Sequence, residues 1–151
     1  LESAGICESV RDRRATLLRF LHKGRNLWEY ALPLFSAPDR YQHWIQWDNP
    51  GYPALLAGMS ALSRRSMIED DHRPTYALWQ RSSQSHLEKG LYRRSRGREE
   101  ANVCLEAWTY NPLTFGDKEM VDRLSLYLSL RDSPDERVQQ QLRKLVEEAS
   151  W

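Results

Sequence analysis

The residues best suited to acid–base or metal chemistry are a short acidic run and one isolated glutamate. The run Asp70-Asp71-His72 comes just before Arg73 and Pro74. Carboxylate and imidazole groups in such a cluster can hold a metal ion or transfer a proton. Clustered acids beside a proline are more often a solvated turn, however, and we favour that interpretation.

Glu106 lies in the middle of an alternating segment, where Glu99 or Glu100 would be its partner in a nuclease-like cluster. No lysine follows Glu106 at short spacing, and the neighbour on its own side is Trp108. We therefore interpret Glu106 as a charge on an edge strand. A small metal-dependent nuclease or hydrolase stays open as the less favoured alternative, built on Asp70, Asp71, His72 and Glu106.

Other catalytic and cofactor signatures are missing from the sequence. Cys7 and Cys104 form no C-x-x-C pair, the four histidines show no metal-ligand spacing, and the seven glycines are scattered singly. No G-x-S-x-G nucleophile elbow occurs. We therefore predict a protein that is not an enzyme, has no cofactor or metal, and belongs to a reducing compartment, the cytoplasm.

Arginine-rich stretches are the stronger functional signal. The candidate binding residues are Lys89, Tyr92, Arg93, Arg94, Arg96 and Arg98, together with Arg11, Arg13 and Arg14 near the N-terminus. Guanidinium groups fit phosphate oxygens, so DNA is one expected partner, and an acidic partner protein or a solvated loop is the alternative. Residues 1–98 hold 16 Lys/Arg and 10 Asp/Glu, whereas residues 99–151 hold 6 and 11. This division of charge predicts one side that attracts anions.

Length and composition limit the fold that positions these residues. The chain has 151 residues, enough for one domain with a proper core. Six tryptophans and seven tyrosines argue against a disordered chain. No apolar run approaches the roughly 20 residues that span a bilayer, so no membrane association is expected.

Apolar periodicity predicts a single α+β domain. Alternating residues indicate a small, mostly antiparallel sheet formed by residues 41–47, 75–79 and 101–110. Helices are predicted over residues 53–65, 119–131 and 134–149. For the last helix, Ser133 is the expected N-cap and Glu136 completes a capping box.

The segment before this domain is expected to contain an arginine-bearing helix over residues 8–23. We divide the chain into a leading basic segment, residues 1–50, and an α+β domain, residues 51–151. At the other end, Trp151 is expected to fold back onto the core.

The segment Tyr52–Met67, YPALLAGMSALSRRSM, resembles the AbiEi-type antitoxin family of type IV toxin–antitoxin systems. Members carry an N-terminal winged helix-turn-helix followed by an antitoxin domain. That domain opens with a small-residue helix around a Ser-Ala-Leu core, which is matched here by Ser60-Ala61-Leu62. The family's acidic turn and leucine-rich helix are similar to Val121–Leu126. The resemblance covers residues 50–151 and depends on short apolar motifs.

A winged helix needs two helices and a hairpin, whereas only about 50 residues precede the Ser-Ala-Leu helix. Residues 1–50 are thus the remnant of an upstream winged-helix region, or the DNA-binding part is divergent or absent. The resemblance implies a non-enzymatic antitoxin or transcriptional regulator of a bacterial phage-defence module, which binds DNA or a partner protein encoded nearby. The alternative is a protein-interaction module that uses the acidic C-terminal helix and Trp151.

Overall fold

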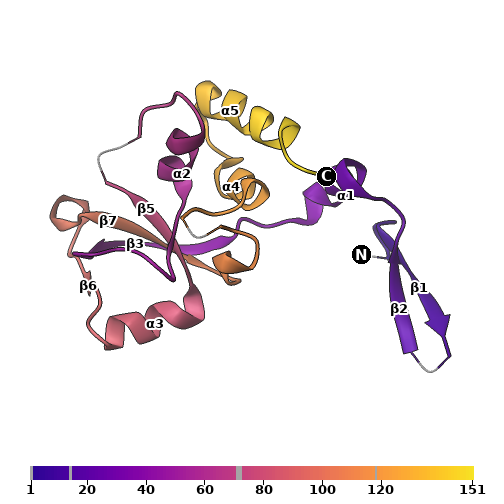
Figure 1. Ribbon diagram of the computed structural model, residues 1–151, viewed down its shortest axis with the longest axis horizontal. Helices are drawn as coiled ribbons and strands as arrows, with labels where there is room; N and C mark the ends of the chain where they lie inside the picture. Colours follow the sequence, from indigo (N-terminus) through magenta and orange to yellow (C-terminus); the bar gives the residue numbers. More distant parts are fainter. Residues whose placement is uncertain (1, 14, 71–72, 118) are drawn as a thin grey trace. The chain divides into compact units, whose positions relative to one another are not determined.

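The computed structural model describes residues 2–13, 15–70, 73–117 and 119–151 (Figure 1). Its helices and strands confirm the predicted α+β fold class. The chain forms two compact units, Leu1–Ser36 with Ser150–Trp151, and Ala37–Ala149. The boundary predicted at residue 50 lies within the second unit. Among the described residues, no helix is both long enough and apolar enough to cross a membrane.

The first unit begins with a two-stranded antiparallel hairpin, so the helix predicted over residues 8–23 is wrong. β1 (Cys7–Asp12) pairs with β2 (Ala15–Phe20), and Arg13 lies in the connecting turn with a φ of 50°. The apolar residues of this segment do not form a stripe complete enough to bury one face of a helix. In a hairpin, each strand is instead held by pairing with its neighbour, and its side chains alternate between the two faces. The β-branched residues Val10 and Thr16 also favour strands.

A short helix follows the hairpin and supplies the aromatic contacts of this unit. α1 (Gly24–Ala31) continues into the 3-10 turn η1 (Leu32–Leu34). The buried ring of Trp28 lies 5.4 Å from that of Phe35 and 6.3 Å from that of Trp151. Trp151, which was predicted to fold back onto the core, belongs to the first unit and is 45% exposed. It packs against Trp28 instead, where the missing side chain of Gly24 leaves space for it.

The second unit is built on a five-stranded sheet in the order β4-β5-β7-β3-β6. β5 and β7 run parallel, and the other neighbours are antiparallel. The predictions for residues 41–47, 75–79 and 101–110 are confirmed as β3, β5 and β7. All six residues of β7 are buried, because this strand is central in the sheet and has a hydrophobic core on each of its faces. The strands are β3 (Asp39–Gln46), β4 (Leu55–Leu56), β5 (Thr75–Trp79), β6 (Arg93–Arg94) and β7 (Val103–Trp108).

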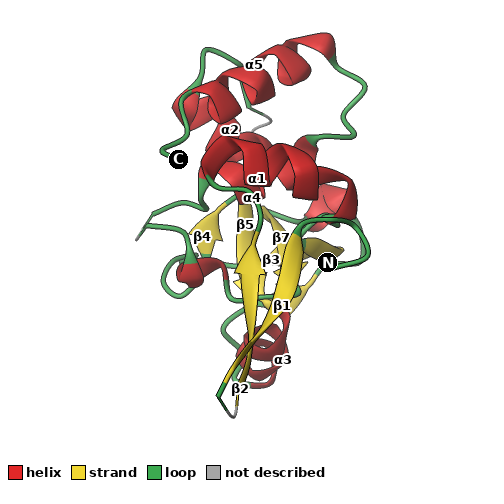
Figure 2. Ribbon diagram, turned by 90° about the vertical axis from the view of Figure 1, so that its right-hand side faces the viewer, coloured by secondary structure: helices red, strands yellow, loops and turns green. Residues whose placement is uncertain are grey.

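Helices cover both faces of this sheet. Figures 1 and 2 show α2 (Gly58–Arg65), α4 (Arg123–Leu130) and α5 (Glu136–Glu147) on one side and α3 (Gln80–Glu88) on the other. Side chains alternate along β7, so Trp108 joins the core of α2, α4 and α5, whereas Leu105 joins the core against α3. Glu106 shares the face of Trp108 and therefore points toward the three-helix layer.

The three predicted helices of the second unit are confirmed, but each begins later than predicted. The helix predicted over residues 53–65 begins at Gly58, because Leu55–Leu56 pairs with β5 as an edge strand. The helix predicted over residues 119–131 is α4. The predicted Ser133 cap of α5 is wrong, since Asp135 is the N-cap and accepts a 2.8 Å hydrogen bond from the N–H of Arg137.

Candidate nucleic-acid interface and a cavity at a buried glutamate

The hairpin places two of the predicted binding residues at its turn. Arg11 and Arg13 are exposed, and neither forms an ion pair within the part of the chain that the structure describes. Further along the ribbon, Arg19 lies opposite Glu8 and pairs with its carboxylate. The turn therefore presents guanidinium groups that form no ion pair with a described carboxylate. Arg14, the third candidate in this segment, lies outside the described residues.

A second group of cations lies at the edge strand β6. Lys89, Arg93, Arg94 and Arg96 are exposed, and the described residues provide no ion pair for any of them. Burial, together with the nearby charge of Arg94, lowers the pKa of the His43 imidazole on β3. His43 is therefore neutral at neutral pH, and the arginines carry the positive charge of this edge.

Two further predicted binding residues are engaged elsewhere. Tyr92 is only 5% exposed, its ring lies 5.6 Å from that of Trp47, and its hydroxyl donates a 2.7 Å hydrogen bond to the carbonyl of Ser83. The expectation that Tyr92 contacts a ligand is therefore wrong, because the ring belongs to the core under α3. The guanidinium of Arg98 lies 5.2 Å from the centre of the Trp44 ring.

The burial of Glu106 was not predicted from the sequence. The prediction of an edge strand is wrong, because β7 lies between β5 and β3 and leaves Glu106 only 3% exposed. Trp108 Nε1 donates a 2.9 Å hydrogen bond to Glu106 Oε2. Burial raises the pKa of the carboxyl to about 7; the Trp108 hydrogen bond opposes this rise and Asp39 adds to it. The nearly continuous apolar run Val103–Trp108 is the signal that indicates a central strand.

A cavity of about 210 Å³ lies beside Glu106. It brings together two acids considered from the sequence, Asp70 and Glu106, whereas Asp71 and His72 lie outside the described residues. Across residues 2–13, 15–70, 73–117 and 119–151, no group of three His, Cys, Asp or Glu side chains is placed to hold a metal ion. The lining residues are Gln42, Trp44, Gly58, Met59, Asp70, Arg73, Thr75, Cys104, Glu106 and Leu130.

Cys104 contributes a thiol to the same cavity. Burial raises its pKa to about 11, and the nearby Glu106 adds to the rise. A thiol with this pKa stays protonated at neutral pH and is a poor nucleophile. Cys104 therefore contributes packing to the cavity wall.

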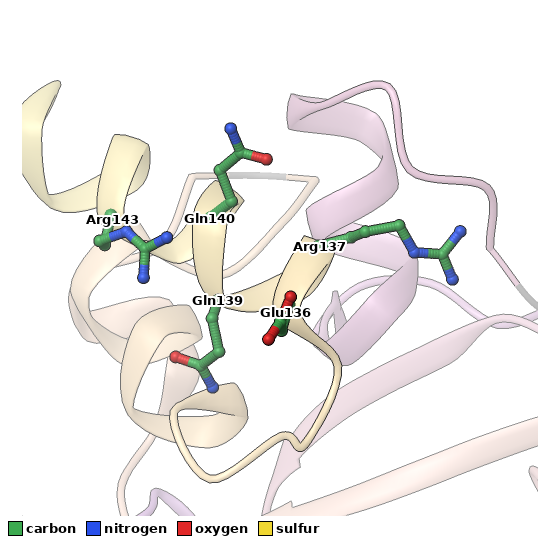
Figure 3. Close-up of a pocket in the computed structure, with 5 residues that line it drawn as sticks. All are labelled: Glu136, Arg137, Gln139, Gln140 and Arg143. Carbon is green, nitrogen blue, oxygen red and sulfur yellow. The ribbon is translucent and has the colours of Figure 1, made fainter.

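A larger hollow of about 480 Å³ lies along the exposed face of α5 (Figure 3). Two of its lining side chains are already engaged: Arg137 pairs with Asp135 at 3.0 Å, and Gln139 donates to two carbonyl oxygens. Figure 3 shows the labelled side chains pointing in different directions, so they form no converging set of groups. The lining residues are Glu136, Arg137, Gln139, Gln140 and Arg143.

The two arginine groups and the cavity at Glu106 are thus the features from which function can be argued. Comparison of the chain with protein-family models, curated proteins and solved structures gave no match.

Proposed function

We propose that this chain is a non-enzymatic, nucleic-acid-binding regulator that acts as an antitoxin or transcriptional regulator in the bacterial cytoplasm. The observation that supports this proposal is the hairpin turn, where Arg11 and Arg13 are exposed and have no carboxylate partner among the described residues. The resemblance of Tyr52–Met67 and Val121–Leu126 to AbiEi-type antitoxins supports the biological setting.

A two-stranded ribbon has a suitable shape for binding DNA. The major groove admits such a ribbon, and arginines are attracted into narrow minor grooves by their enhanced negative potential. Guanidinium groups also bind phosphate oxygens through paired hydrogen bonds. Asp12 offsets one positive charge near the turn, and Arg14 is a further cation of the same segment.

The arginines of β6 fit a second, less specific contact. Arg93 and Arg94 are adjacent on a strand, so their side chains leave opposite faces of the sheet edge. Each of them can neutralise a phosphate on its own face, which adds affinity without reading the base sequence.

Fluorescence anisotropy with a labelled DNA duplex tests the proposal directly. We expect the double substitution Arg11→Gln/Arg13→Gln to weaken binding by about 10-fold or more, because two phosphate or base contacts are lost. Arg137→Gln is the matched control: this arginine is also exposed but is paired with Asp135, and its loss should leave binding unchanged. Arg93→Gln/Arg94→Gln measures the contribution of the second surface.

Equal affinities for all of these variants, or no measurable binding, would contradict nucleic-acid recognition by the hairpin. That outcome would favour the protein-interaction module built on α5 and Trp151. A nucleotidyltransferase gene immediately downstream would be independent support for the antitoxin setting.

A further inference from the structure

Glu106 carries a carboxylate oxygen without a hydrogen-bond partner in the described structure. Oε2 accepts the hydrogen bond from Trp108, whereas Oε1 forms no hydrogen bond or ion pair with any described residue. The side chain is almost fully buried and lines the cavity of about 210 Å³. Oε1 therefore has an unused acceptor position at the cavity, and a ligand that donates to it would form a hydrogen bond that no described residue makes.

The start of α2 leaves room for this oxygen. Gly58 has a φ of +52°, and a Cβ at this position would lie 3.0 Å from Glu106 Oε1 and 3.0 Å from Thr75 Cγ2. The N-cap residue Ala57 provides no side-chain hydrogen bond to the helix. The carboxylate therefore lies near the positive end of α2, which favours its ionised form. The ionised form is the one that holds a cation.

The other charged groups on the cavity wall are also without partners. Asp70 and Arg73 are partly buried, and within the described part of the chain neither forms a hydrogen bond or an ion pair. When Glu106 is ionised, two carboxylates and one guanidinium line the same small space. The guanidinium of Arg98 beside Trp44 balances the second carboxylate, so the attraction for a cation comes from the ionised Glu106 carboxylate itself.

The remaining walls suit an organic cation better than a metal ion. The Trp44 ring, Met59 and Leu130 line the cavity. The guanidinium of Arg98 lies 5.2 Å from the centre of the Trp44 ring. Apolar walls of this kind suit the ring or chain of an organic cation, and no three-ligand metal cluster occurs among the described residues. The volume is below the about 300–1,000 Å³ of sites for drug-sized ligands, so it fits a molecule with a single ring.

We propose that this cavity binds a small organic cation, a protonated amine or amidinium on a single ring or short chain, whose N–H groups donate to Glu106 Oε1. Trp44 and Leu130 would pack against the apolar part of this molecule. The inference does not depend on nucleic-acid binding by the hairpin.

Benzamidine and its neutral isostere benzamide are suitable probes for isothermal titration calorimetry on the full chain at pH 8. We expect benzamidine to bind at least about 10-fold more tightly than benzamide, because only the amidinium pairs with the carboxylate. Glu106→Gln keeps an acceptor for Trp108 but removes the charge, so it should abolish this preference. Glu99→Gln, on the exposed turn η2 (Arg98–Glu100), is the matched control and should retain it.

The dependence on pH separates ligand binding from a purely structural role of Glu106. With a pKa of about 7, the carboxyl is mostly protonated at pH 6 and mostly ionised at pH 8. Benzamidine affinity should therefore fall about 10-fold from pH 8 to pH 6. The other charged or titratable groups near Glu106 are Asp39, Asp70, Arg73 and Cys104.

Equal binding of the two probes, or an unchanged preference in folded Glu106→Gln, would overturn the proposal. If that variant does not fold, Asp70→Asn should still weaken benzamidine binding by about 3-fold, since it removes one partly exposed wall charge. Carbon NMR of the Glu106 carboxyl in the unmodified chain gives a second measurement. Benzamidine must lower its titration midpoint, and an unchanged midpoint would equally overturn the proposal.

Discussion

Burial controls the ionisation of Glu106 and so links this residue to the stability of the protein. Its carboxyl has a pKa of about 7 in the folded chain, against an ordinary value of 4.5. The folded state therefore holds the proton more tightly than the unfolded state does. Stability from this group is fully present below pH 4.5 and is lost as the pH rises through 7. The complete loss corresponds to about 3 kcal/mol.

Replacing Glu106 with glutamine should remove this dependence, because the amide has no proton to lose. The unfolding free energy of Glu106→Gln minus that of the wild type should rise by about 2–3 kcal/mol when the pH is raised from 5 to 8. Urea unfolding at the two pH values measures the gain, and Glu99→Gln should show none. A constant difference between Glu106→Gln and wild type at both pH values would show that the buried carboxyl does not titrate as described.

The exposure of the arginines could be anticipated from the sequence, and the apolar run Val103–Trp108 indicates a central strand, but the elements that cover Tyr92 and Glu106 could not be anticipated. Arginine is rarely buried without a partner, so Arg93 and Arg94 were expected to lie on the surface. Whether Tyr92 or Glu106 is buried depends on which elements cover it. Local sequence does not state that α3 lies over Tyr92 or that β5 pairs beside Glu106.

The start of α4 shows how one side chain fixes the end of an element. Asp122 Oδ1 accepts hydrogen bonds from the N–H groups of Leu124 at 3.1 Å and Ser125 at 2.9 Å. These are two of the N–H groups that a helix leaves without partners at its first turn. Asp122 Oδ2 is buried and has no hydrogen-bond partner among the described residues. Asp122 thus stabilises α4 through one oxygen only.

Removing this cap should cost stability in proportion to the lost hydrogen bonds. We expect Asp122→Ala to lower the unfolding free energy by about 1–2 kcal/mol, and Asp122→Asn to lower it less because the amide keeps an acceptor. Asp132→Ala is the matched control, since this exposed side chain caps nothing, and it should stay within about 0.5 kcal/mol of the wild type. Equal stabilities of the two alanine variants in chemical denaturation would refute the capping role.

Elements with clear period-two alternation were predictable, and the hairpin was not. In β3 and β7 one face is apolar or aromatic at every second position, so the strands followed from the sequence. In the hairpin Leu17 and Leu18 are adjacent and both more than half exposed, so no apolar face marks the strand period. β1 and β2 are stabilised by pairing with each other. Counting apolar residues at helical spacing along residues 8–23 does not detect such a pairing.

At the scale of the whole molecule, charge is the property that connects the sequence to the proposed function. Residues 1–98 contain both exposed arginine groups and 16 of the 22 Lys/Arg residues, whereas residues 99–151 hold 6 Lys/Arg and 11 Asp/Glu. A polyanion is attracted to the basic elements and repelled by the acidic ones. Nucleic-acid binding should therefore depend on the hairpin and β6.

The salt dependence of DNA binding tests this central claim most directly. Each phosphate contact contributes a slope of roughly −0.9 to a plot of log Kobs against log salt concentration. We expect a steep negative slope for the wild type and a slope shallower by up to roughly 2 for Arg11→Gln/Arg13→Gln. A slope near zero for the wild type, or identical slopes for the two proteins, would contradict binding through the hairpin arginines.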